Sequence, residues 1–191
     1  MRRSSVLVIT CVLCLGCKAD SVNQFPFEGE GKITAAYKMA DISTLANSYG
    51  KGLRLISVSS EEVGPDGTSP KWRYEYVVTP LPMPPPPATY CFHSTYSTVA
   101  FDSNSTYRVG SAIVTHTWFD SNVALTIAED NGGRQFRAQN QNSTITAGLG
   151  EPVVPNPTTY WWITYRAKED KSKSLTLGID ANTGLITTRY P

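Results

Sequence analysis

The feature that most constrains the fold is a pattern that occurs twice along the chain. Residues 72–76 (WRYEY) carry a large aromatic residue at every second position, and a similar alternation returns 89 positions later in residues 161–165 (WWITY). Each stretch lies downstream of a helix-type segment that ends in glycine, at Gly50 and at residues 132–133. Successive residues of a strand point to opposite faces, so each stretch predicts a strand with one buried face. The chain is therefore expected to contain two diverged repeats of one unit.

Each repeat predicts one helix and an antiparallel β-meander. In the first, apolar residues recur every three or four positions over residues 33–49, as on one face of a helix, and Gly50 supplies a left-handed stop. In the second, Asp120 can cap a helix that ends at residues 131–133. Strands are predicted at residues 52–63, 72–78, 89–101, 107–117, 134–138, 143–149, 160–167 and 174–179 and near Tyr190, with a turn at 102–105. This pattern predicts an α+β fold, two repeats of a helix packed on an antiparallel β-meander that can share one continuous sheet.

The first residues have the order of a secretory signal. Arg2 and Arg3 precede an apolar run over residues 6–15, which is too short to span a bilayer as a mature helix. The run ends in Gly16 and Cys17 and resembles a bacterial lipobox, in which diacylglycerol is attached to the cysteine thiol before cleavage. The alternative is an ordinary signal peptide with an incidental cysteine. Lipidation of Cys17 is the favoured interpretation.

These features set the expected boundaries and address of the chain. The segments are a signal peptide at residues 1–16, a lipid-anchored tether at 17–31, a first repeat at 32–118 with a proline-rich connector at 80–88, and a second repeat at 119–191. An acylated Cys17 implies a membrane anchor in the bacterial cell envelope, with the body in the periplasm or on the surface. Lys18 stands where inner-membrane retention would place an aspartate, which favours the outer membrane.

Composition and motifs argue against several classes of function. The formal charge is +1 and charged residues make up 17% of the chain, so no nucleic-acid groove that neutralises phosphates is expected. The sequence has neither a phosphate-cradling motif nor a nucleophile elbow. His93 and His116 have no carboxylate or cysteine at helical spacing, although pairing of their strands would bring the imidazoles together. We therefore predict no cofactor, no metal site and no enzymatic activity; an enzyme of unfamiliar type is the remote alternative.

The C-terminal strands resemble a known family. Residues 160–165 (YWWITY) followed by residues 175–186 (LTLGIDANTGLI) are similar to the end of a PepSY-type domain, in which a W-x-V-x-Y strand leads into a V-x-V-D-A-x-T-G-x-V hairpin. Turn chemistry also explains part of this pattern, because Asp180 can accept bonds from N–H groups two residues on and Gly184 tolerates a positive φ. The resemblance implies an exported α+β module with an inhibitory or chaperone-like binding role, here in tandem.

The strand at residues 160–166 carries large aromatic residues on both faces, which makes it the candidate binding strand. Alternate residues from Trp161 face one way, whereas Tyr160 and Trp162 face the other. Tyr160 and Trp162 either pack against a second layer or form an exposed patch that binds a partner. We therefore predict a non-catalytic binding module for a protein or peptide partner. The alternative is a structural or assembly accessory lipoprotein of the envelope without a soluble ligand.

Overall fold

The computed structural model describes residues 31–78, 88–106, 113–114, 117–150 and 158–191. The first repeat contains α1 (Met39–Tyr49), β1 (Leu53–Ser60), β2 (Trp72–Val78), β3 (Ala88–Ser94) and β4 (Val99–Thr106). The second contains α2 (Ser121–Ala128), the kinked segment η1 (Glu129–Gly133), α3 (Arg134–Gln139), β5 (Thr144–Gly150), β6 (Tyr160–Arg166), β7 (Ser174–Asp180) and β8 (Ile186–Tyr190). The predicted signal peptide, most of the tether and residues 80–87 of the predicted connector lie outside the described residues, whereas Ala88, its last predicted residue, begins β3.

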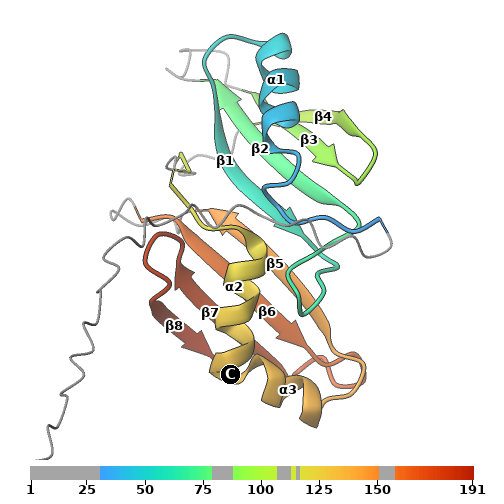
Figure 1. Ribbon diagram of the computed structural model, residues 1–191, viewed down its shortest axis with the longest axis vertical. Coiled ribbons are helices and arrows are strands. Elements are labelled where there is room, and N and C mark those ends of the chain that lie inside the picture. The colour runs from blue at the N-terminus through green and yellow to red at the C-terminus, as the bar shows by residue number, and fades with distance from the viewer. Residues whose placement is uncertain (1–30, 79–87, 107–112, 115–116, 151–157) are drawn as a thin grey trace, which may run out of the picture.

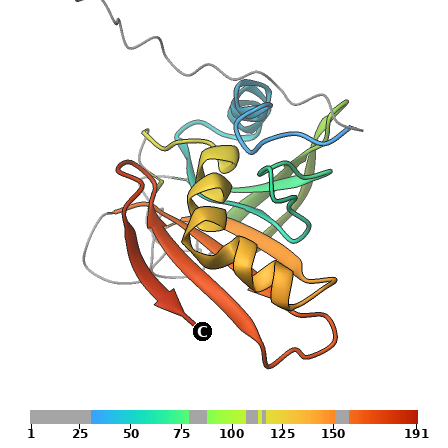
Figure 2. The ribbon, with the colours of Figure 1, turned by 60° about the horizontal axis from the view of Figure 1, so that its bottom comes forward.

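All eight strands form one antiparallel sheet in the order β4-β3-β2-β1-β5-β6-β7-β8. Each repeat is a helix followed by a four-strand meander, and α1, α2 and α3 all lie on the same face of the sheet (Figures 1 and 2). The prediction of an α+β fold with one continuous sheet is confirmed. We call the face that the helices cover the helix face and the opposite one the open face.

The two repeats meet where β1 pairs with β5. This contact is short: it joins Ser57 to Gly150, Val58 to Leu149, Ser59 to Gly148 and Ser60 to Ala147. The strands that pair, β1 and β5, are the first strands of the two meanders, and they run antiparallel. Outward from this junction, the strands of each repeat therefore follow in chain order, β1 to β4 on one side and β5 to β8 on the other. The junction therefore lies at the centre of the sheet.

The core lies between the sheet and the helices, and one tryptophan in each repeat is its centre. Trp72 and Trp161 are both fully buried, and their rings meet edge to face at 6.2 Å across the junction. The indole N–H of Trp72 donates to the carbonyl of Ile33, and that of Trp161 to the carbonyl of Phe119, each at 2.8 Å. Both acceptors precede the helix of their own repeat, so each tryptophan fastens its helix to its strand. The alternation that predicted two repeats thus reflects a shared packing solution.

Asp120 caps α2, as predicted, and also binds the first repeat. Its Oδ1 accepts from the backbone N–H of Ser121 at 2.6 Å and from that of Ala36 at 2.9 Å. The Ser121 hydroxyl accepts from the N–H of Ala35 and donates to the carbonyl of Gly67. A Cβ on Gly67 would lie 2.3 Å from the backbone of Asn122, so only glycine lets this loop reach α2.

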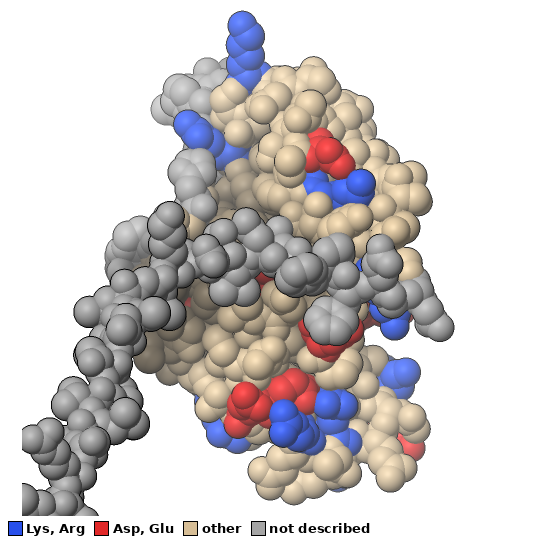
Figure 3. All heavy atoms as spheres, in the orientation of Figure 1, with Lys and Arg blue, Asp and Glu red and all other residues tan. Residues whose placement is uncertain are grey.

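The predicted strand at residues 134–138 is wrong, because these residues form α3. Gly132 has a φ of 115° and was expected to end the helix, but the chain only bends there and continues. Arg, Gln and Ala favour helix over strand. Arg137 also holds the bend closed with two bonds to the buried Glu129, at 3.0 and 2.6 Å. Acidic and basic side chains lie side by side over this region on the helix side of the molecule (Figure 3).

The predicted turn at residues 102–105 is also wrong, because those residues belong to β4. The hairpin turn lies earlier, where the N–H of Thr95 donates to the carbonyl of Thr98 and their hydroxyls bond at 2.8 Å. β4 is an edge strand of the sheet, so its polar residues can be hydrated and need no hydrogen-bond partners inside the protein. Of the strand predicted at residues 107–117, only 113–114 and 117 are described, and none of these is in a strand. Gly50 does end α1, but with extended backbone (φ −179°) rather than a left-handed one.

Candidate functional site

The open face of β6 carries the two predicted site residues. Along β6, Trp161, Ile163 and Tyr165 are buried on the helix face, whereas Tyr160 and Trp162 are partly exposed on the open face. The Tyr160 and Trp162 rings lie 6.1 Å apart with 49° between their planes. No described helix or strand packs over this face, since the three helices lie on the other one. The structure therefore places Tyr160 and Trp162 together, on the side of the sheet away from the core.

The Trp162 ring lies against the β7 backbone because its neighbour on β7 is a glycine. Trp162 pairs with Gly178, and a Cβ at Gly178 would come within 2.9 Å of the indole ring and 3.2 Å of Thr188. The missing side chain leaves room for the ring to cover the β7 backbone. The indole is partly exposed beside the Tyr160 ring. We call Tyr160 and Trp162 the aromatic platform.

Next to the aromatic platform the open face is floored by the smallest side chains of the sheet. Strand register aligns Tyr160 with Gly150 and Ser57, and Trp162 with Gly148 and Ser59. A Cβ placed on Gly148 would meet nothing within 4 Å, so the space above it is open. We call this floor, made by Ser57, Ser59, Gly148 and Gly150, the trough; it runs along β1 and β5 at the junction of the repeats.

The other wall of the trough belongs to the first repeat and is charged. The same rows continue from Ser57 to Glu75 and from Ser59 to Arg73 on β2. Arg73 binds the Glu75 carboxylate at 3.1 Å, and Ser57 donates to Glu75 at 3.0 Å. Three strand spacings separate β2 from β6, so the walls stand roughly 14 Å apart. A hollow of about 520 Å³ lies at this side of the trough, lined in part by Ser59, Arg73 and Glu75.

Arg73 is also held by a buried thiol. Its guanidinium lies 3.2 Å from Sγ of Cys91, which is fully buried under it. Partial burial alone would lower the pKa of Arg73, but the Cys91 contact and the Glu75 and Asp102 carboxylates outweigh it and raise the pKa. Arg73 therefore keeps its charge and is engaged by groups of its own repeat. The Cys91 thiol is free of any disulfide and buried.

His93 is paired with a carboxylate at the outer end of the same face. Its Nδ1 lies 2.5 Å from Oδ1 of Asp102 on β4, and Lys71 lies 3.9 Å from the other oxygen of that carboxylate. A histidine bonded to a carboxylate supplies two of the three members of a hydrolytic triad, and a nucleophile would be the third. The thiol on the same strand, Cys91, contacts Arg73 and not this histidine. His116, the other predicted histidine, lies outside the described residues. Within the described ranges no three His, Cys, Asp or Glu side chains gather as a metal site would require.

The sequence indicated the aromatic platform but not the trough. In the sequence, Tyr160 and Trp162 stand out as large aromatic residues on the strand face opposite Trp161. Ser57, Ser59, Gly148 and Gly150 carry no such signal, because they become a floor only when β1 pairs with β5. The isolated glycines within residues 143–149 and 174–179 were the available hint, since glycine inside a strand marks a close approach.

Comparison with protein-family models, with curated proteins and with solved structures found no match for this chain. The resemblance of residues 160–186 to a PepSY-type domain therefore rests on the residues that carry it. Among the described helices, none has the length and apolar character needed to cross a membrane. Cys17 and the lipobox lie outside the described residues.

Proposed function

We propose that this chain is an exported, lipid-anchored binding module of the bacterial cell envelope. It does no chemistry of its own and holds a protein or peptide partner against its open face, in the manner of a protease inhibitor or a chaperone. The observation that carries the proposal is the aromatic platform, two partly exposed rings on a sheet face that no described element covers. Apolar rings presented in this way are the usual anchors of protein interfaces.

The trough adds a reason why the partner is a polypeptide. Strand glycines such as Gly148 and Gly150 let another backbone come close to the sheet. The charged wall offers Arg73 and Glu75 already paired with each other, so a partner can meet it without leaving a lone charge buried. A segment lying in the trough would thus contact aromatic rings on one side and polar side chains on the other.

The anchor is the acylated Cys17, with residues 18–31 as the tether. Two signals are generally needed for stable anchoring, and a diacylglycerol thioether with its acyl chains supplies more than one hydrocarbon chain. Mass spectrometry of the mature protein tests this directly. We expect an N-terminal Cys17 carrying the mass of its lipids, and loss of that mass in Cys17→Ser. A mature chain that begins elsewhere without lipid would contradict the anchor.

The binding role is tested by crosslinking in intact membranes of the cells that make the protein. Trp162→Ala should lower the yield of crosslinked partner at least tenfold, because removing an interface anchor costs about 2 kcal/mol or more. Tyr96→Ala is the matched control, since it removes a ring that is 46% exposed on the hairpin of the first repeat. An equal yield from Trp162→Ala and wild type would contradict the proposal. A secreted enzyme as partner would favour inhibition, whereas outer-membrane machinery would favour the assembly role.

A further inference from the structure

The exposed apolar surface of the open face continues beyond the aromatic platform to the free edge of the second repeat. Tyr190 on β8 pairs with Thr176, and the Thr176 hydroxyl bonds that of Thr164 on β6, so these side chains lie on the open face. Tyr190 is 56% exposed, and Leu185, between β7 and β8, is 67% exposed. They are the two most exposed large apolar side chains in the described part of the chain. Exposed apolar groups therefore follow this half of the sheet from β6 to β8.

Between these groups, the open face of the second repeat carries hydroxyls and little negative charge. Strand register places five threonines on it: Thr144, Thr146, Thr164, Thr176 and Thr188. Among the described open-face residues of β5 to β8, Asp180 is the one carboxylate, and it accepts from the N–H groups of Asn182 and Thr183. This half of the face can therefore be covered without burying an unpaired negative charge.

The same half of the open face ends in a basic hairpin. Arg166 follows Tyr160, Trp162 and Thr164 along this side of β6 and is exposed. The hairpin that it begins, residues 166–173, contains four basic and two acidic residues. The side chains of Arg166, Lys168 and Lys171 make no hydrogen bond or ion pair in the described ranges. The second repeat therefore presents free positive charge beside its exposed rings.

The described chain starts next to this hairpin. Lys32 lines a hollow of about 280 Å³ together with Lys168 and, from the first repeat, Glu61 and Glu62. Fourteen residues separate Lys32 from Cys17. Fully extended, they reach at most about 50 Å. A bilayer that holds an acylated Cys17 is therefore within reach of the basic end of the open face.

We propose that the open face of the second repeat rests on an anionic lipid bilayer when no partner occupies it. The rings of Tyr160, Trp162 and Tyr190 lie among the headgroups, where tyrosine and tryptophan are favoured because each has an apolar body and one polar atom. Arg166 and the hairpin lysines contact the lipid phosphates. This inference rests on the proposed anchor and adds a regulation of the proposed binding face, because a partner has to displace the bilayer from the aromatic platform.

Quenching of tryptophan fluorescence by brominated lipids tests this contact in the intact protein. The protein is reconstituted in vesicles of brominated phosphatidylcholine, either alone or mixed equally with brominated phosphatidylglycerol. The mixed vesicles should quench more strongly, and salt at about 1 M should remove the difference because it shortens the Debye length to about 3 Å. Trp162→Phe should lose most of the quenching. Equal quenching in both kinds of vesicle, or undiminished quenching of Trp162→Phe, would overturn the proposal.

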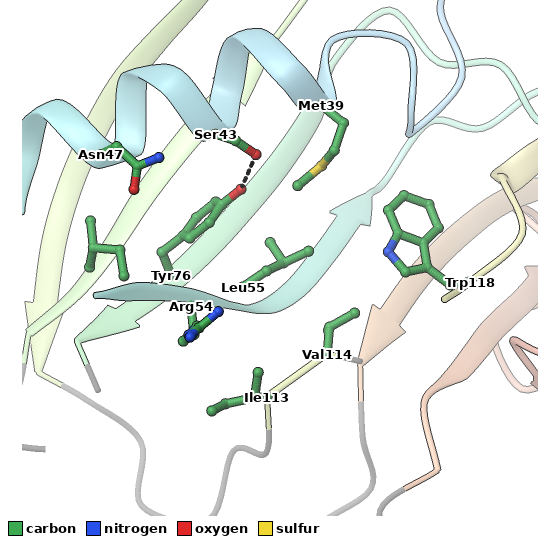
Figure 4. Close-up of a pocket in the computed structure, with 10 residues that line it drawn as sticks. Met39, Ser43, Asn47, Arg54, Leu55, Tyr76, Ile113, Val114 and Trp118 are labelled. Carbon is green, nitrogen blue, oxygen red and sulfur yellow. Dashed lines mark hydrogen bonds between the residues drawn. The ribbon is translucent and has the colours of Figure 1, made fainter. Parts of the chain in front are cut away.

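Trp118 provides the matched control, because it is partly exposed on the helix side of the sheet. Its ring packs edge to face on the buried Trp161 at 6.0 Å, and it lines a hollow together with Met39 and Ser43 of α1 (Figure 4). Trp118→Phe should therefore be quenched as strongly as wild type. Loss of quenching in this variant would mean that the helix side faces the lipid, which contradicts the proposal.

Two double variants that remove the same charge test the role of the hairpin. Arg166→Gln with Lys168→Gln should remove most of the extra quenching that phosphatidylglycerol gives, since each basic side chain near an anionic surface changes the equilibrium about fivefold. Lys51→Gln with Arg54→Gln, at two exposed positions of the first repeat, should leave it unchanged. Equal losses would assign the effect to net charge and overturn the proposal. The anchor is judged separately: a protein with lipid on Cys17 that shows no such quenching overturns the bilayer contact and leaves the anchor standing.

Discussion

The two repeats are alike on the helix face and different on the open face. On the helix face, Trp72 and Trp161 occupy equivalent positions and each donates its indole N–H to the carbonyl ahead of its own helix. On the open face, the first repeat carries charged side chains that bind one another, Arg73 to Glu75 and His93 to Asp102. The second repeat carries there the aromatic platform and glycines. The two repeats therefore share the packing of the core and differ in their exposed surface.

Because their open faces differ, we expect the two repeats to contribute differently to the proposed partner interface. Ion pairs that are satisfied within the first repeat add little to binding, because they must be desolvated before they can be used. Partly exposed aromatic rings without ion pairs lose only water when they are covered. For the proposed interface we therefore expect the second repeat to supply most of the binding energy and the first to supply a polar wall that limits what fits in the trough.

The largest expected effect tests whether the two tryptophans are equivalent. Trp72→Ala and Trp161→Ala should each lower the free energy of unfolding by about 3–5 kcal/mol, since each removes a fully buried ring. Because the rings touch, the double variant should lose less than the sum of the two. Urea denaturation followed by circular dichroism measures all three. A nearly neutral variant at either position would show that the repeats are not energetically equivalent.

The second prediction compares the ion pair between Glu129 and Arg137 in the second repeat with the one between Lys38 and Asp41 at α1 in the first. Glu129 is 7% exposed in its bond to Arg137, whereas Asp41 is 57% exposed in its contact with Lys38. Glu129→Gln should lower the free energy of unfolding by about 1–3 kcal/mol, because it leaves Arg137 facing a buried neutral group. Asp41→Asn should change it by less than about 0.5 kcal/mol. Thermal unfolding of both variants measures this, and equal losses would mean that burial does not distinguish the repeats.

Two glycines of the open face allow folding and binding to be separated. Gly178→Ala should lower the free energy of unfolding by about 1–2 kcal/mol, because its Cβ collides with the Trp162 ring. Gly148→Ala should change stability by no more than about 0.5 kcal/mol, since nothing lies within 4 Å of its Cβ, yet it raises the floor of the trough. Gly148→Ala should therefore weaken crosslinking to the partner while melting at the wild-type temperature. Undiminished crosslinking would remove the trough from the interface.

The smallest effect concerns the hairpin turns. Partial desolvation by itself would raise the pKa of Asp180. The backbone N–H groups of Asn182 and Thr183 donate to its carboxylate and outweigh this effect, so they hold the pKa of Asp180 below its usual range. A lowered folded-state pKa gives stability that is present above about pH 4, the unfolded value, and is lost as pH falls through the folded value. Asp180→Ala should thus cost about 0.5–1 kcal/mol at pH 7 and less below pH 4. Thr95→Ala, in the uncharged turn of the first repeat, should cost a similar amount that does not change with pH, as acid titration of both variants will show.

Most elements followed from local pattern. The strand β2 was visible because its large residues alternate, and α1 because its apolar residues recur at helical spacing. The predicted start of that helix at residue 33 is wrong, because α1 begins at Met39 and Ile33 forms a bridge with Ser69 instead. The Asp120 cap and the Asp180 turn followed from side chains that bond their own backbone. These features depend on residues close in sequence, which is why the sequence alone revealed them.

The predictions that are wrong concern segments whose local sequence pattern is compatible with two different structures. Gly132 adopts the positive φ expected of a helix stop, yet the Glu129–Arg137 pair and tertiary packing carry the chain on into α3. Residues 102–105 have the composition of a turn, yet they extend β4 because an edge strand accepts polar side chains. In both places the composition is compatible with two structures, and the tertiary contacts determine which of them forms.

The sequence by itself determined the α+β class, the two repeats and the position of the aromatic platform, because periodicity and turn chemistry act over a few residues. The tertiary structure decided that β1 pairs with β5, and with that register it made the trough from Ser57, Ser59, Gly148 and Gly150. It also left the first half of β1 paired with β2 but not with β5. These contacts join residues that are far apart in the sequence, and no local propensity fixes which of them will meet.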